Sequence, residues 1–79
     1  MVTVHRESGL RFIIFVDDHP PAHVHIVGDG KAKVNIAGSD GRPELVYNDG
    51  LKAGDLRKAL RIVAEQQAML MEKWSEHHG

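Results

Sequence analysis

The feature that most constrains the fold is a change in hydrophobic spacing near residue 50. Before this point apolar and polar residues alternate, as expected for β-strands, whose side chains point to opposite faces in turn. From about Ala53 the apolar residues recur every three or four positions, which predicts an amphipathic helix. The apolar stripe of this helix consists of Leu56, Leu60, Val63, Gln67, Leu70 and Trp74.

These two patterns predict an α+β fold, in which an antiparallel β-meander of about four to five strands packs on one long C-terminal α-helix. The chain has 79 residues, which is enough for one domain and a thin core. We therefore predict a single domain over residues 1–79. The meander occupies residues 1–50, including the HPPAHVH connector, and the helix lies within residues 51–79.

Turn signals divide the first half of the chain into strands. The segment Gly28-Asp29-Gly30 predicts a tight hairpin, and its length places His25 opposite Lys33 and His23 opposite Asn35. The segment from Asp17 to Pro21 cannot continue a regular strand, because its two prolines lack backbone donors, and it is expected to be a stiff, extended connector. The strands are expected at residues 2–5, 10–16, 23–27, 31–36 and 44–47.

The composition indicates the cellular compartment in which the protein is expected. It has no cysteine, which excludes a disulfide framework and a thiolate zinc site and favours a reducing compartment. Its longest apolar run is too short to span a membrane, and its start lacks the apolar core of a signal peptide. The formal charge of -1 gives no global attraction to nucleic acid or to anionic membranes. A cytosolic protein with no membrane association is therefore expected.

The candidate site is the polar face of the hairpin. His23 and His25 are two residues apart on a strand, so their rings share a face, and they are candidate acid and base groups. Lys31, Lys33 and Asn35 lie on the same face and suit a phosphate or nucleic-acid ligand. RNA cleavage without a metal needs such groups. Histidines and lysines on the solvated face of a hairpin also occur without any function.

Two other functions are open. The first is a divalent-metal site for zinc or a similar ion, formed by His19, His23, His25 and Asp18, although the ammonium group of Lys33 would repel the ion. By contrast, if the histidine and lysine face binds phosphate or nucleic acid, no cofactor is needed.

The second alternative is a non-catalytic protein-interaction domain. In it, an apolar second face at Ile13 and Phe15 binds a further copy of the chain or another protein. Near the C-terminus, Trp74 is expected to fill the core, while His77 and His78 favour the negative end of the helix dipole. Whether these two histidines join the site stays open.

Several motifs occur together in this chain: GLRFIIFVDD, HPPAHVH, AKV in the hairpin, NDG before the helix, and a tryptophan near the helix end. In this combination the chain resembles the small bacterial domain-of-unknown-function family numbered 4160. The matching positions are Pro20, Pro21, His23, His25, Lys33, Gly50 and Trp74. The resemblance implies a cytosolic bacterial protein that is often encoded beside a second small protein, in a toxin-antitoxin-like pair. It implies no established reaction, and His77-His78 departs from the aromatic residue usual after the tryptophan.

The first expectation is therefore a small cytosolic bacterial component of a two-protein module, whose histidine and lysine face binds phosphate or nucleic acid. Whether the protein is an enzyme is left open.

Overall fold

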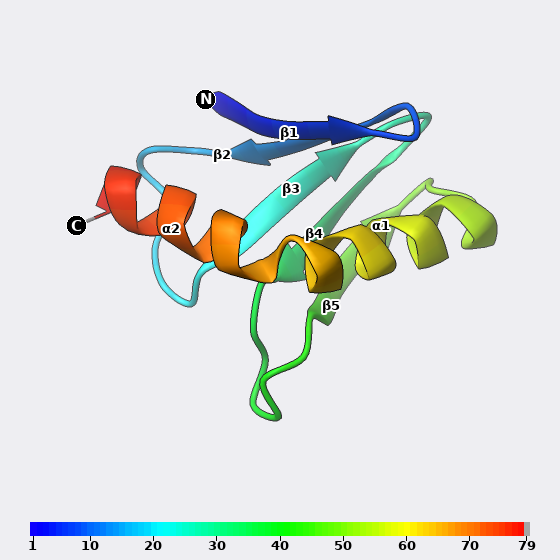
Figure 1. Ribbon diagram of the computed structural model, residues 1–79. Coiled ribbons are helices and arrows are strands. Elements are labelled where there is room, and N and C mark those ends of the chain that lie inside the picture. The colour runs from blue at the N-terminus through cyan, green and yellow to red at the C-terminus, as the bar shows by residue number, and fades with distance from the viewer. Residues whose placement is uncertain (79) are drawn as a thin grey trace.

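The fold is a five-stranded antiparallel sheet followed by two helices (Figure 1), seen in a computed structural model that describes residues 1–78. The strands lie in the sheet in chain order, which confirms the α+β class and the predicted meander. Gly79, which ends the predicted helical range, lies outside the described residues. The strands are β1 (Val2–Glu7), β2 (Leu10–Ile14), β3 (His23–Val27), β4 (Lys31–Asn35) and β5 (Glu44–Asp49), and the helices are α1 (Ala53–Glu65) and α2 (Gln67–His78).

The register of the central hairpin is as predicted. His25 pairs with Lys33 and His23 pairs with Asn35, because the loop of three residues leaves no other in-register pairing. Position 30 in this loop must be glycine, because there is no room for a side chain. A Cβ atom there would lie 2.3 Å from the carbonyl carbon of Gly50, at the end of β5.

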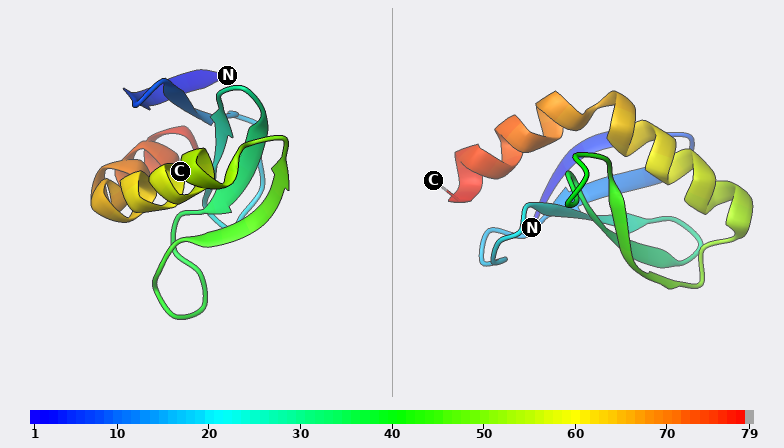
Figure 2. Two further views of the ribbon diagram at one scale, coloured as in Figure 1. Left: turned by 90° about the vertical axis from the view of Figure 1, so that its right-hand side faces the viewer. Right: turned by 90° about the horizontal axis from the view of Figure 1, so that it is seen from below.

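The core lies between the sheet and the helices, which cover one face of the sheet (Figure 2). Alternate residues of the central strands fill it from one side, and the apolar stripe of the helices fills it from the other. The predicted strand over residues 10–16 is too long at its end, and Val16 lies outside β2. It is 55% exposed, because β2 ends at Ile14 and the chain turns away. The largest fully buried side chains are Phe12, Ile14, Ile26, Ile36, Ile62, Leu70, Val24, Val34 and Val63.

The prediction of one long C-terminal helix is wrong in one respect, because the helical segment is divided into two. Gln66 leaves the helical region, with φ -103° and ψ 16°, between α1 and α2. The helices arch over the sheet (Figure 2), and the break lets Ile62 and Val63 on α1 and Trp74 on α2 reach the same core. In residues 1–78 neither helix combines the length and the apolar character needed to cross a bilayer.

The side chain of Gln67 fixes the place of the break. Its Nε2 donates hydrogen bonds of 2.8 Å to the carbonyl oxygens of both Ile36 and Gly41, in the loop between β4 and β5. Gln67→Ala should lower the free energy of unfolding by about 1–3 kcal/mol, because the part-buried carbonyl of Ile36 loses its donor.

Urea unfolding followed by circular dichroism measures this change. Gln66→Ala, at the preceding position, is the matched control and should cost less than about 0.5 kcal/mol. Equal losses for the two variants would contradict a specific role for Gln67.

Candidate metal centre

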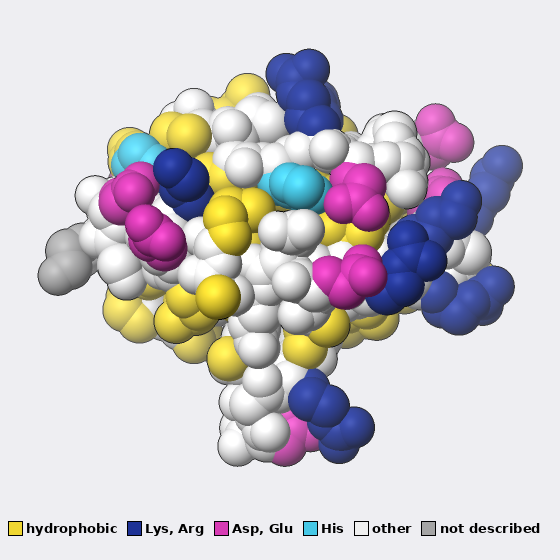
Figure 3. Space-filling view, in the orientation of Figure 1, with side chains coloured by type: hydrophobic (Ala, Val, Ile, Leu, Met, Phe, Trp, Pro, Cys, Tyr) yellow, Lys and Arg dark blue, Asp and Glu magenta, His cyan; other side chains and the backbone are white. Residues whose placement is uncertain are grey.

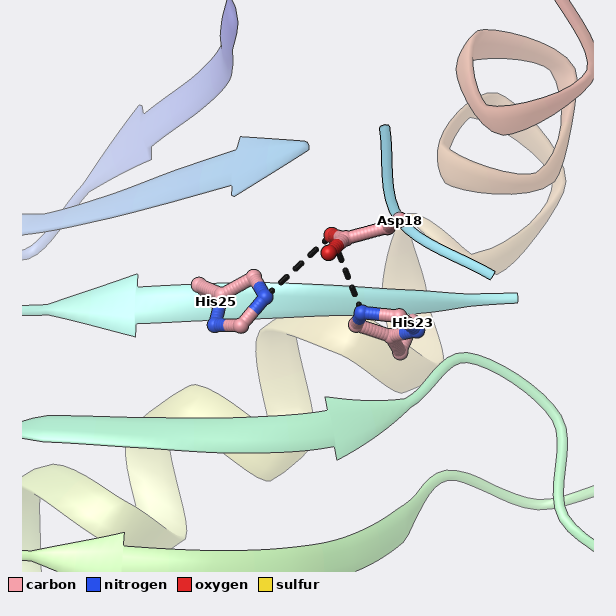
Figure 4. Close-up of side chains that lie close together, drawn as sticks. All are labelled: Asp18, His23 and His25. Atoms are coloured by element: carbon pink, nitrogen blue, oxygen red, sulfur yellow. Dashed lines mark hydrogen bonds and ion pairs between the residues drawn. The ribbon is translucent and has the colours of Figure 1, made fainter. Parts of the chain in front are cut away.

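Two segments that are close in sequence build the site. β3 places His23 and His25 on one face, as alternation requires. The connector before β3 is not extended, contrary to the prediction. The chain turns at Val16–Asp17, where the Asp18 N–H donates to the carbonyl of Phe15 at 3.1 Å, and it bends again at the two prolines. This turn brings the Asp18 carboxylate back over the start of β3 (Figure 4).

Asp18 lies between the two imidazole rings. Its Oδ2 atom is 3.0 Å from Nε2 of His23 and 3.3 Å from Nε2 of His25 (Figure 4). One potential ligand atom from each of the three residues lies within 4.8 Å of the others. This spacing is compatible with one ion bound by all three, since bonds from zinc to histidine nitrogen or carboxylate oxygen are about 2.0–2.2 Å long.

The tautomer of His23 follows from its second nitrogen. Nδ1 lies 2.8 Å from the carbonyl oxygen of Pro21, and because a carbonyl only accepts, Nδ1 must donate. In the neutral ring Nε2 then carries a lone pair, and this nitrogen lies 3.0 Å from Oδ2 of Asp18. Metal-binding histidines are usually held in this way, with the other ring N–H donated to a backbone carbonyl.

His23 is not on a solvated face, contrary to expectation. It is only 3% exposed, and its ring centroid lies 5.0 Å from that of Trp74 on α2. Nε2 of this ring is buried and makes no hydrogen bond to any of residues 1–78, although Asp18 Oδ2 is close to it. Leaving such an atom without a partner costs about 1–3 kcal/mol, so the site needs a proton or a cation at this point.

His25 has a different environment. Its ring meets the edge of the Phe15 ring at a centroid distance of 4.6 Å and an interplanar angle of 78°. Burial is the main cause that lowers the pKa of His25 below its ordinary value of 6.5, and His23 and Lys33 lower it further. The Asp18 carboxylate raises the pKa of His25. A lowered pKa keeps the ring neutral near pH 7, which is the form that binds a metal.

The other predicted ligands and anion-binding residues lie around this group. His19 is exposed on the connector and does not join the three potential ligands. Lys33 is half-buried directly opposite His25, whereas Lys31 is exposed and lies opposite Val27. Asn35 lies opposite His23, but its side-chain amide donates to Oε1 of Glu44 at 3.1 Å. Of the predicted phosphate-binding residues, only Lys33 is both near the histidines and free of a side-chain partner in residues 1–78.

The C-terminal histidines do not supply ligands to this group. The His78 ring stacks on Trp74, with centroids 3.7 Å apart, and its Nδ1 and Nε2 lie 3.0 and 3.1 Å from the carbonyl oxygens of Trp74 and Phe15. These contacts tie the end of α2 to the residue where the connector begins. His77 is half-buried and lies outside the three-residue group.

The predicted apolar second face is largely closed within the chain itself. Ile13 is 2% exposed, and Phe15 packs on His25. Exposed apolar side chains occur instead on the edge strand β5, at Leu45, Val46 and Tyr47. No further copy or partner is needed to bury Ile13.

Chemically, two neutral imidazoles and a carboxylate form a ligand set that zinc and other first-row divalent ions accept. Three protein ligands leave positions for water or a substrate, as in catalytic rather than structural zinc sites. Phe15 and Trp74 supply the apolar walls, which sequence patterns did not identify as part of the site.

Comparison with known families gives one match. The model of a domain of unknown function, DUF4160, matches residues 9–75, which cover most of the sheet, the three clustered residues and Trp74. No curated protein and no solved structure matches the chain.

Proposed function

The chain belongs to the DUF4160 family, and because the description of that family assigns no function, we propose from the site itself that this protein binds a divalent metal ion. The ligands are Nε2 of His23, Nε2 of His25 and the carboxylate of Asp18. Zn²⁺ is the first ion to test, because imidazole nitrogens and a carboxylate are among its usual ligands.

One observation carries the proposal. Nε2 of His23 is buried without a hydrogen bond to any residue that the structure describes, and it lies 3.0 Å from a carboxylate oxygen of Asp18. Nδ1 of the same ring already donates to the carbonyl of Pro21. A lone pair and an anionic oxygen held this close repel each other unless a positive charge lies between them. A divalent ion supplies that charge and gives the buried nitrogen a partner.

The local charges favour a cation over phosphate as the first ligand. Asp18 raises the pKa of His25 by more than Lys33 lowers it, so the field at the ring is dominated by the carboxylate. A phosphate group placed directly between the histidines would meet Asp18 at close range. The attraction of a cation to the Asp18 carboxylate therefore outweighs its repulsion by Lys33.

Titration of Zn²⁺ into the metal-free protein, followed by isothermal calorimetry, tests the proposal. We expect saturation at one ion per chain, with a single class of site. His19→Ala is the matched control, because His19 belongs to the same connector but is exposed and outside the ligand group. It should leave the affinity unchanged within about twofold. Heat changes that do not saturate would overturn the proposal.

The wider role stays a prediction. The family resemblance suggests a bacterial two-protein, toxin-antitoxin-like module, and composition suggests a cytosolic location. A nucleic-acid ligand is suggested by the histidines and lysines of the hairpin. On the face that Figure 3 shows, Lys and Arg side chains gather mainly over the α1 end, whereas the connector lies at the other end, beside α2 (Figure 1). A nucleic acid bound at the metal site would therefore gain little from the basic side chains on this face.

A further inference from the structure

Building on the proposed metal centre, we propose that Lys33 completes an anion site in which a phosphoryl group bridges the bound ion and the Lys33 ammonium group. One phosphoryl oxygen occupies an open coordination position of the ion. A second oxygen accepts a hydrogen bond from Lys33. The ligand class is a phosphate monoester or inorganic phosphate.

The sheet register places Lys33 beside the site. Ile13, His25, Lys33 and Tyr47 pair in succession from β2 to β5, so they form one row across the face away from the helices. Direct cross-strand neighbours have Cβ atoms about 4.5–5.5 Å apart, which is well within the reach of a lysine side chain. The ammonium can therefore approach the open side of an ion held by His25.

Among the residues that the structure describes, none forms an ion pair with the ammonium group of Lys33. The Lys33 residue is nevertheless half-buried. A cation kept beside a cation-binding site is unfavourable unless an anion binds to both.

The balance of charge indicates the class of anion. A divalent ion bound by one carboxylate and two neutral imidazoles carries a net charge of roughly +1, and Lys33 raises the total to roughly +2. A phosphate monoester near neutral pH carries a charge of about -1.5 to -2 and offers three acceptor oxygens. A carboxylate brings a charge of only about -1. A phosphoryl group therefore fits the site better than a simple organic acid.

The test uses Co²⁺-loaded protein, because the visible absorption of the ion responds to a change in its ligands. Inorganic phosphate is titrated into the wild-type protein and into Lys33→Gln. We expect the Co²⁺ spectrum to change and saturate in the wild-type protein, and the phosphate affinity to fall at least about 10-fold in the variant. The Co²⁺ affinity of Lys33→Gln should stay equal or increase, because a repelling charge is removed.

Two further variants make the result specific. Lys31→Gln is the matched control, since it removes the same charge from the same face of β4 but lies opposite Val27, and it should leave phosphate affinity unchanged. Lys33→Arg keeps the charge and should retain most of the affinity. Unchanged phosphate affinity in Lys33→Gln would overturn the proposal.

Two more ligands distinguish the possible sources of the phosphoryl group. They are adenosine monophosphate and an RNA oligonucleotide with hydroxyl ends. Stronger binding of the monophosphate supports a monoester. If the oligonucleotide binds more strongly and Lys33→Gln loses this binding, the phosphoryl contact is supported, but the phosphoryl group belongs to a nucleic acid. If Co²⁺ binds and none of the phosphates alters its spectrum, the anion site does not exist, whereas absence of Co²⁺ binding defeats the metal centre itself.

Discussion

Replacing Trp74 by alanine should lower the free energy of unfolding by about 3–5 kcal/mol, the range for removing a large aromatic side chain from a core. Trp74 is 7% exposed and joins the end of α2 to the core, to His23 and to His78. Domains of this size are stable by only about 0.05–0.15 kcal/mol per residue, so the loss is a large part of the total. The variant should be partly unfolded at 37 °C.

Urea unfolding of this variant must be followed by circular dichroism, because Trp74 is the one tryptophan of the chain and its removal eliminates the fluorescence signal. Met71→Ala is the control on the same helix. Met71 is 37% exposed, and its truncation should cost less than about 1 kcal/mol. If both variants unfold at the same urea concentration, the packing role of Trp74 is contradicted.

His23→Phe should reduce Zn²⁺ affinity by at least about 100-fold, while the metal-free protein keeps its fold. Loss of a group that only supports a ligand already costs about 10- to 100-fold, and His23 is itself a proposed ligand. Phenylalanine preserves a ring beside Trp74. It loses the hydrogen bond to Pro21 but also removes the unpartnered Nε2 atom, so the two effects on stability largely offset.

Calorimetric titration with Zn²⁺ and urea unfolding of the metal-free variant measure the two effects separately. His19→Phe introduces the same side chain at an exposed histidine outside the ligand group, and it should bind Zn²⁺ as the wild type does. Retention of wild-type affinity by His23→Phe would show that its ring is no ligand.

The fold was predictable where local spacing determines it. The hairpin register followed from Gly28-Asp29-Gly30, and the face of each strand followed from alternation. The break at Gln66 was not predictable, because Gln67 is held by carbonyl groups 31 and 26 residues away in sequence. An amphipathic stripe continues through Gln67, so no local pattern marks the end of α1.

The site was predictable only in part, for a similar reason. Alternation placed His23 and His25 together, and cross-strand pairing placed Lys33 beside them. The position of Asp18 depends on the turn at Val16–Asp17, which returns the carboxylate to β3. The burial of His23 depends on Trp74, near the other end of the chain, so it has no signal in the sequence around the histidine.

The three proposed ligands lie within one short segment, since Asp18 and His25 are only seven residues apart. Closing so short a loop costs little entropy, so a nascent chain could capture an ion once β2 and β3 have left the ribosome, before either helix exists. The unfolded chain would then also hold the ion weakly, and added metal would stabilise the protein by less than its affinity for the folded state implies. Trp74 arrives last and packs on the ring of His23, while the side chains of His25 and Asp18 stay 20% and 21% exposed, so the ion could leave past these two ligands without movement of α2.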